Sequence, residues 1–194
     1  MSHPTIYFIR HGQTDWNAEL RLQGQRDISL NAKGRAQAAR NGRMLASLLG
    51  DPTRFHFTAS PLARARETME IVRAELGLVA AEYATEDCLK ELSFGAWEGQ
   101  SWPELIRDAP HAIEERAANT FDFAPPDGES YRQLSERVAN WFDAIERDTV
   151  VVSHGGVSRV LRGYLLSLAE ADITELKVPQ DKIMRIRGPE VDWH

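Results

Sequence analysis

The chain is poor in cysteine, in long apolar runs and in positive charge. It has a single cysteine in 194 residues, which excludes an internal disulfide framework and is typical of a reducing compartment. No apolar stretch approaches the roughly 18 residues of a membrane-spanning helix, and the amino terminus lacks the apolar segment of a signal peptide. We therefore expect a cytoplasmic location and no membrane partner.

The charge balance is acidic. Asp and Glu number 29 against 23 Lys and Arg, which gives a formal net charge of −6. Such a balance argues against nucleic acid as a partner. Repeats and low-complexity tracts are also missing, and the length suits one domain with a sizeable core. The sequence predicts a single α/β domain over residues 1–194.

The most informative segment is the R-H-G triplet at the end of a β-branched and aromatic run, residues 6–9. The run predicts a buried strand that Gly12 ends. Arg10 and His11 then lie at the carboxyl end of a strand, where open α/β sheets place their ligand sites. A guanidinium suits phosphate oxygens, and a neutral imidazole is both a nucleophile and a proton carrier. Alone, the triplet would also fit a strand end with a surface ion pair.

The S-P-L-A-R-A motif that begins at Ser60 follows a second short strand. Ser60 is the expected N-cap of a helix over about 61–76, with proline at its first position. Arg64 in the first turn opposes the helix dipole, so we expect Arg64 and backbone N–H groups to share a bound phosphate. The alternative is an ion pair with an acid on the same helix, which we expect for Arg66 and Arg73.

A third segment repeats the order strand, histidine, glycine. Residues 149–152 predict a buried strand, His154 follows it, and Gly155 and Gly156 allow a tight turn into an amphipathic helix. Two histidines at strand ends could also bind a metal. However, no H-E-x-x-H motif accompanies them, Cys88 stands alone, and arginines near both sites disfavour a cation. We expect no metal and no cofactor.

Glu91 opens the aromatic-rich turn E-L-S-F-G-A-W-E-G. Phe94 and Trp97 would desolvate its carboxyl group and favour the protonated form, which a general acid for a leaving alkoxide needs. An isolated glutamate is weak evidence, because most are solvated surface charges. Glu98 in the same turn is expected to be structural.

Residues 97–130 interrupt the alternation of strands and helices with prolines and scattered aromatics. This composition predicts a cover segment over the strand ends. Its aromatic side chains either wall a pocket for the alcohol part of an ester or pack in the core. These side chains are Trp97, Trp102, Phe121, Phe123 and Tyr131.

Four arginines lie close to the motifs in sequence. Arg21 and Arg26 in the loop after the first motif would meet a second anionic group or, as we expect, remain solvated surface charges. Arg159 and Arg162 lie on the helix after His154, and we assign neither a catalytic role.

The remaining segments predict ordinary elements. Asn31 should cap a helix that ends near residue 49, and Ser130 with Gln133 forms a capping box that starts a helix to about residue 147. Residues 182–187 are expected to form a last edge strand, and 188–194 a loose tail.

Taken together, these motifs give the chain a family resemblance. It resembles the histidine phosphatase superfamily, the phosphoglycerate mutase-like group. The family pattern is R-H-G-x-T-x-x-N, and residues 10–17 of this chain, R-H-G-Q-T-D-W-N, match it. L-Q-G-Q-R-D-I-S-L, S-P-L-A-R-A, E-L-S-F-G-A-W-E-G, P-P-D-G-E-S and S-H-G-G follow in family order, so the resemblance covers residues 6 to about 168. It implies a three-layer α/β/α sandwich with a mostly parallel central sheet.

The resemblance also implies residue roles. His11 would be the nucleophile that becomes phosphohistidine, neutral on one nitrogen and held through its other N–H by a backbone carbonyl. Glu91 would protonate the leaving group and then activate water, while His154 near the phosphate would be charged. Arg10, Arg64 and His154 would bind the phosphoryl oxygens, and Asn17 would add a hydrogen bond. Thr14, Gln23 and Gly24 would line the pocket.

The expected function is that of a metal-independent phosphomonoesterase for a small phosphorylated metabolite. One alternative is a cofactor-dependent phosphoglycerate mutase, but those relatives carry a longer insertion than the 62 residues between Glu91 and His154. G-A-W-E-G also resembles the phosphatase branch, which includes phosphatases of ribazole phosphate and sugar phosphates. A binding module that holds phosphate without turnover is a third reading. Apolar helix faces are compatible with a homodimer as well as with a core.

Overall fold

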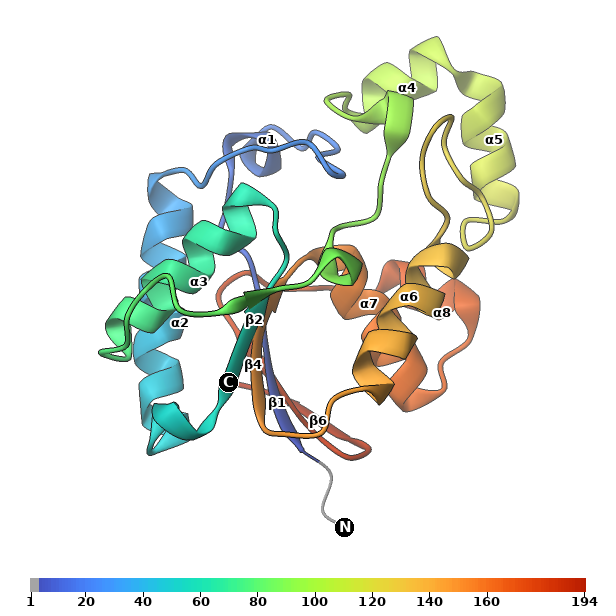
Figure 1. The fold of residues 1–194 in the computed structure, drawn as a ribbon. Helices are drawn as coiled ribbons and strands as arrows, with labels where there is room; N and C mark the ends of the chain where they lie inside the picture. Colours follow the sequence, from blue (N-terminus) through green and yellow to red (C-terminus); the bar gives the residue numbers. More distant parts are fainter. Residues whose placement is uncertain (1–3) are drawn as a thin grey trace.

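The computed structural model describes residues 4–194 as a central sheet with helices on both faces (Figure 1). The strand order is β3-β2-β4-β1-β5-β6. The four strands β3, β2, β4 and β1 run parallel, whereas β5 and β6 are antiparallel to their neighbours. The predicted three-layer, mostly parallel α/β fold is confirmed. The strands are β1 (Thr5–Arg10), β2 (His56–Ala59), β3 (Ala84–Thr85), β4 (Thr149–Ser153), β5 (Ile183–Arg187) and β6 (Glu190–Trp193).

The helices form two layers and a group above the sheet (Figure 1). One face of the sheet carries α2 (Ala32–Leu49) and α3 (Ala63–Glu75). The other carries α6 (Tyr131–Asp143), α7 (Gly155–Leu166) and α8 (Glu170–Glu175). Above the carboxyl ends of the strands lie α1 (Asp15–Ala18), α4 (Trp102–Asp108) and α5 (Pro110–Ala118). Short 3₁₀ turns occupy Pro52–Arg54, Asp87–Leu89 and Gly95–Trp97.

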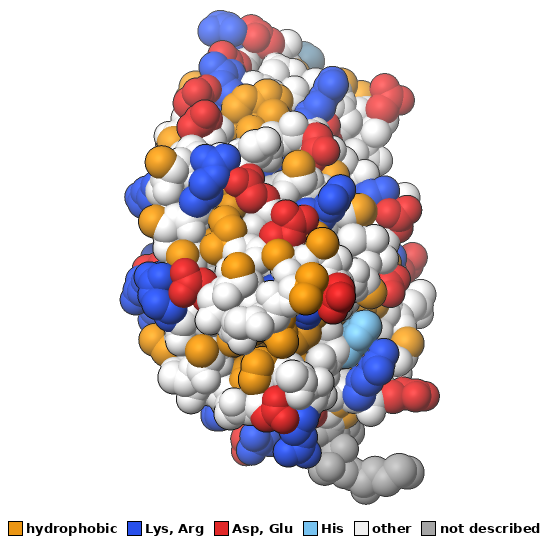
Figure 2. All heavy atoms as spheres, turned by 60° about the vertical axis from the view of Figure 1, so that its left-hand side comes forward, with side chains coloured by type: hydrophobic (Ala, Val, Ile, Leu, Met, Phe, Trp, Pro, Cys, Tyr) orange, Lys and Arg blue, Asp and Glu red, His pale blue; other side chains and the backbone are white. Residues whose placement is uncertain are grey.

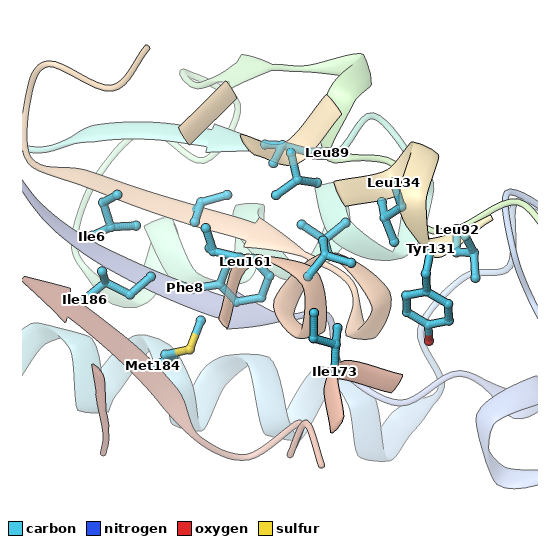
Figure 3. Close-up of a cluster of buried hydrophobic side chains, with 14 of the residues drawn as sticks. Ile6, Phe8, Leu89, Leu92, Tyr131, Leu134, Leu161, Ile173, Met184 and Ile186 are labelled. Carbon is cyan, nitrogen blue, oxygen red and sulfur yellow. The ribbon is translucent and has the colours of Figure 1, made fainter. Parts of the chain in front are cut away.

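Strand β1 separates two hydrophobic cores. Ile6 and Phe8 belong to the core under α6 and α7, and Figure 3 shows Phe8 near Leu161 of α7 and Ile6 near Ile186 of β5. Tyr7 and Ile9 belong to the core under α2 and α3. A strand buried on both faces needs apolar side chains at every position, which explains the unbroken run after Thr5.

The parallel pairing of β1 with β4 places the two candidate histidines together. Arg10 pairs with Ser153 at the carboxyl ends of the two strands. The backbone N–H of His11 then donates to the carbonyl of Ser153 at 2.9 Å. His11 and His154 therefore leave the sheet side by side, although 143 positions separate them in the sequence.

Helix boundaries follow local capping. Asn31 caps α2 as predicted, since its side chain accepts from the backbone N–H of Gly34. The predicted capping box of Ser130 and Gln133 at α6 is also confirmed. However, α6 ends at Asp143 and not near residue 147, because Asp148 is fixed to the sheet edge: its carbonyl accepts from His56 and its carboxylate from Thr5.

The carboxyl terminus differs from the prediction. Residues 188–194 are not a loose tail, because β6 pairs antiparallel with β5. β6 is therefore the edge strand, and β5 lies between it and β1. Gly188 adopts a φ of 56° in the two-residue turn, and Arg185 pairs with Asp192 across the strands at 2.6 Å. The short, charged pattern of residues 190–193 hides this strand in the sequence.

The surface mixes both signs of charge. Figure 2 shows basic and acidic side chains interspersed, with small hydrophobic areas between them. Across residues 4–194, no helix combines the length and apolar composition needed to cross a membrane.

Candidate active site

A cavity of about 420 Å³ opens at the carboxyl end of β1, beneath the cover segment. Predicted site residues from five separate segments line it: Arg10, His11, Asn17, Gln23, Gly24, Arg64 and Glu91. Thr14 and His154 lie outside the lining. A larger hollow of about 900 Å³ at the amino ends of β2 and β4 contains none of the predicted residues.

The hydrogen bonds of His11 fix its tautomer. Its Nδ1 lies 2.7 Å from the carbonyl oxygen of Gly12, which can only accept, so Nδ1 carries the proton. Its Nε2 receives the Nε–H of Arg64 at 3.3 Å and therefore carries the lone pair. His11 is only 2 % exposed yet lines the cavity. The expected backbone contact is present, and it leaves Nε2 as the nucleophilic atom.

Arg64 is a buried cation without an ion pair among the described residues. Its side chain is fully buried, and its Nη1 and Nη2 donate to the carbonyl oxygens of Arg26 and Gly24. Burial lowers its pKa to about 10, although Glu91 and more distant acids act in the opposite direction. The guanidinium is thus oriented towards His11 by the backbone and not by a carboxylate.

The start of α3 differs from the prediction. Ser60 does not cap the helix, which begins at Ala63. Its hydroxyl accepts from the N–H of Leu62, ahead of the helix, at 3.3 Å and lies 2.7 Å from His154 Nε2. The first backbone N–H of α3 donates to the carboxylate of Asp27 at 2.6 Å. Asp27 therefore occupies a position where we expected a phosphate, and the guanidinium of Arg64 remains as the anion-binding group.

Two further polar atoms beside His11 lack partners. Within residues 4–194, the Nε of Arg10 and the Nδ1 of His154 are buried without a hydrogen bond, although buried polar atoms rarely remain unpaired. The ring centres of His154 and His11 lie 5.1 Å apart. Arg10 is anchored through Nη1 on the carbonyl of Val178 at 2.6 Å. Both atoms are suited to bind an oxyanion that reaches His11.

Burial lowers the pKa of both histidines well below the ordinary 6.5, and the charge of Arg64 lowers it further. The protein groups around His154 therefore favour its neutral form. Without a bound anion both rings are therefore neutral, and the charge expected on His154 beside a phosphate stays a prediction. A charge on His154 requires an anion, whose field would counter that of the arginines.

Stability should fall as the pH falls below about 6.5. In that range the unfolded chain binds protons that His11 and His154 exclude in the folded state, and each contributes a slope of about 1.4 kcal/mol per pH unit. Replacing His11 with asparagine keeps a donor for Gly12 and removes one titrating group. Between about pH 6.5 and 5.5 the unfolded histidine is only partly protonated, so we expect His11→Asn to reduce the mean slope in urea unfolding by about 1 kcal/mol per pH unit.

The matched control is His111→Asn, at an exposed position of α5. Inorganic phosphate should also reduce the slope in the wild type. An anion that holds a proton on His154 reduces the difference in the number of protons bound by the folded and unfolded chains. An equal slope in the wild type and His11→Asn would contradict this assignment.

Backbone N–H groups hold the carboxylate of Glu91 at the start of α7. Its Oε1 accepts from Leu92 N and Gly156 N, each at 2.9 Å, whereas Oε2 has one longer contact of 3.3 Å with Gly156 N. A Cβ at position 156 would lie 2.4 Å from Oε1, so only glycine allows this approach. Oε2 is consequently the oxygen available to carry a proton into the cavity.

The aromatic surroundings of Glu91 are only partly as predicted. Phe94 lines the cavity with it, but Trp97 turns into the cover segment and stacks on Phe123 at 5.2 Å. Glu98 is structural, as expected: its Oε1 accepts from Gln25 N at 2.8 Å.

The loop after β1 supplies polar groups to the cavity. Asn17 Oδ1 accepts from Thr14 N and Gln180 Nε2, which leaves its Nδ2 for a ligand. The hydroxyl of Thr14 donates to Gln23 Oε1 at 2.9 Å, so Thr14 positions Gln23 from outside the cavity. Gly24 has a φ of 52°, and a Cβ there would overlap the Glu98 carboxylate. Gly24 serves the site by holding Arg64.

The aromatic residues of the cover segment divide between cavity and core. Trp102 and Tyr131 line the cavity. Phe121 belongs to the hydrophobic core, and Trp97 and Phe123 stack on each other. Both alternatives in the sequence analysis are therefore correct, each for some of these side chains.

The arginines outside the core motifs have different surroundings. Arg21 lines the cavity but is neutralised by Glu19 and Glu104, at 2.9 and 3.1 Å. Arg26 is exposed, as expected, and it also pairs with the carboxylate of Glu98 at 3.5 Å. Arg73 does not form the predicted ion pair, because its Nε donates to a backbone carbonyl and its guanidinium lies over a phenylalanine ring.

Sequence reasoning missed several residues of the site, among them Arg116, Arg159 and Gln180. Arg159 lines the cavity, and its place one turn into α7 after His154 could have indicated this. Gln180 donates to both the His11 carbonyl and Asn17 Oδ1 at 3.1 Å. Gln180 lies 169 positions from His11, and no motif marks it.

Within residues 4–194, no set of three or more His, Cys, Asp and Glu side chains is placed to hold a metal ion. The charged groups nearest His11 Nε2 are guanidiniums. This constellation can bind an oxyanion, attack its central atom and deliver a proton from Glu91.

Comparisons with known proteins agree with this arrangement. The family model of the histidine phosphatase superfamily (branch 1) matches residues 6–194. The Probable phosphoglycerate mutase GpmB of Salmonella arizonae is 33% identical over 193 residues, which cover 97% of this chain and 86% of that protein. Sequence similarity thus extends over nearly the whole chain.

Two solved structures share the fold. A mycobacterial glucosyl-3-phosphoglycerate phosphatase solved with VO3 aligns with a TM-score of 0.80 at 27% identity, covering 98% of this chain and 96% of that one. The alpha-ribazole phosphatase of Shigella flexneri aligns with a TM-score of 0.82 at 23% identity, covering 98% and 94%. The chain is an enzyme of the phosphatase type and belongs to the histidine phosphatase superfamily.

Proposed function

We propose that the protein is a metal-independent phosphomonoesterase that hydrolyses small phosphate esters through a phosphohistidine on His11. The observation that carries the proposal is the contact between Arg64 and His11. A fully buried guanidinium without an ion pair donates to the lone-pair nitrogen of a neutral imidazole. Burying an unpaired cation is costly, so this geometry is best explained by a phosphoryl group that binds both.

In the first step, His11 Nε2 attacks phosphorus in line with the ester oxygen. The N–P bond forms as the P–O bond breaks, and the leaving alkoxide takes the proton from Glu91 Oε2. Arg10, Arg64 and His154 stabilise the equatorial oxygens, for which Arg10 Nε and His154 Nδ1 are unpaired.

In the second step, the Glu91 carboxylate accepts a proton from water. The resulting hydroxide attacks the phosphohistidine, inorganic phosphate leaves, and His11 returns to its neutral form. Two guanidiniums and a protonated His154 supply the positive charge that a metal ion would otherwise provide. The mechanism therefore predicts full activity without a metal.

The test is hydrolysis of p-nitrophenyl phosphate after treatment with EDTA. We expect turnover to survive chelation, and its loss with recovery on added divalent ions would refute metal independence. The names of the relatives favour one second candidate, a phosphoglycerate mutase. Interconversion of 2- and 3-phosphoglycerate that depends on a bisphosphoglycerate primer, without net phosphate release, would establish the mutase.

A further inference from the structure

The outer part of the cavity carries positive charge that the proposed chemistry does not use. Five arginines line the cavity, against two glutamates, Glu91 and Glu175. Arg10 and Arg64 lie beside His11, and Arg21 is neutralised by its own acids. Arg116 and Arg159 remain, and neither forms an ion pair among residues 4–194.

Arg159 reaches the cavity from α7. Its Nε donates to the carbonyl of Leu176 at 2.9 Å, which fixes the side chain. A Cβ on Gly155 would lie 3.7 Å from Arg159 Nη1 and 3.6 Å from Arg10 Nε. Both guanidiniums therefore lie beside Gly155, and Arg159 adds positive charge to the cavity next to Arg10.

Arg116 reaches the cavity from α5 in the cover segment. Its guanidinium lies over the ring of Trp102, 4.6 Å from the ring centre. Burial lowers the pKa of Arg116, Tyr131 and Glu175 act against this, and the nearby charge of Arg159 lowers it further. The two arginines are thus close enough to repel each other, and an anion between them would relieve that repulsion.

Tyr131 lies in the same part of the cavity and supplies a neutral donor. Burial raises the pKa of its phenol, so the hydroxyl stays protonated. Figure 3 shows its ring at the edge of the hydrophobic core, near Leu92. Two guanidiniums and a hydroxyl make a donor set suited to an oxyanion.

We propose that Arg116, Arg159 and Tyr131 bind a second oxyanion on the alcohol part of the substrate. Preferred substrates are then phosphate esters that carry a carboxylate or a second phosphate group. The inference rests on the proposed function, because it assumes that Arg10, Arg64 and His11 hold the transferred phosphoryl group. Arg159 thereby acts in substrate selection, a role that the sequence analysis did not give it.

The test compares phosphonates that cannot be hydrolysed. Para-carboxybenzylphosphonate and its neutral carbamoyl analogue differ only in the second charge, and binding is measured by calorimetry. We expect the wild type to bind the carboxylate about tenfold more tightly, and Arg116→Met or Arg159→Met to abolish that preference. A bisphosphonate with the same ring tests phosphate as the second group.

Matched controls separate this role from general effects of charge. Arg162→Met removes an arginine from the same helix that does not line the cavity, and Arg107→Met does so in the cover segment. Both should keep the preference, and Arg159→Lys should keep part of it. An unchanged preference in Arg116→Met and Arg159→Met would overturn the proposal. Equal weakening of both ligands in Arg159→Met would also overturn it, because Arg159 would then hold the transferred group.

The binding test is independent of turnover. A wild type that shows the preference but hydrolyses no phosphate ester would refute the proposed function and leave the second-anion site intact. A wild type that hydrolyses phosphate esters but binds both phosphonates equally would support the proposed function and refute the second-anion site.

Discussion

Replacing His11 with asparagine should lower kcat for phosphate-ester hydrolysis by about 10,000-fold or more, because it removes the nitrogen that forms the proposed covalent intermediate. The asparagine amide can still donate to the Gly12 carbonyl as Nδ1 does at 2.7 Å, so the strand end should remain in place. The lone-pair nitrogen that faces Arg64 is lost. Steady-state hydrolysis of p-nitrophenyl phosphate measures the effect.

The same substitution at His111, which is exposed on α5, should leave kcat at the wild-type level. Phosphate binding provides a second comparison, since His11→Asn retains Arg10, Arg64 and His154. We expect it to bind phosphate within about tenfold of the wild type. Residual turnover within tenfold of the wild type would show that His11 is not the nucleophile.

Replacing Glu91 with glutamine should have an effect that depends on the leaving group. Glutamine can still accept the two backbone N–H groups through Oε1 but cannot supply the proton that Oε2 carries. For an alkyl phosphate, whose alkoxide leaves poorly, kcat/KM should fall by about 100- to 10,000-fold. For p-nitrophenyl phosphate, whose phenolate leaves readily, kcat/KM should fall by no more than about tenfold.

The second step should respond differently. Because Glu91 also activates water, Glu91→Gln should lower kcat for p-nitrophenyl phosphate and produce a burst of nitrophenolate as phosphohistidine accumulates. Glu98→Gln is the matched control, since Glu98 also accepts backbone N–H groups but does not line the cavity. A fall in kcat/KM of equal size for both substrates would contradict a proton-donor role.

Much of the fold and of the inner site could be predicted from local sequence. Apolar runs that end at Arg10 and Ser153 predict parallel strands, and such strands bring their carboxyl ends to one edge of the sheet. The convergence of His11 and His154 follows from that topology. Arg64 could be found because a cation in the first turn of a helix needs an anion to compensate for the dipole.

Contacts between distant segments could not be predicted. Ser60 forms a hydrogen bond with His154, which lies 94 positions away, and Gln180 supports His11 from a loop near the end of the chain. Arg116 and Arg159 belong to one site only because the cover segment places α5 beside the start of α7. Such contacts depend on how layers pack, and residue spacing along one chain does not encode them.

The most direct test of the account is to identify the phosphorylated atom. Glu91→Gln is mixed with p-nitrophenyl phosphate, quenched in alkali, which preserves phosphohistidine, and analysed by mass spectrometry and NMR. The account predicts one phosphoryl group, labile to acid, on Nε2 of His11. Phosphate on His154, on Nδ1 of His11 or on no residue during turnover would contradict it.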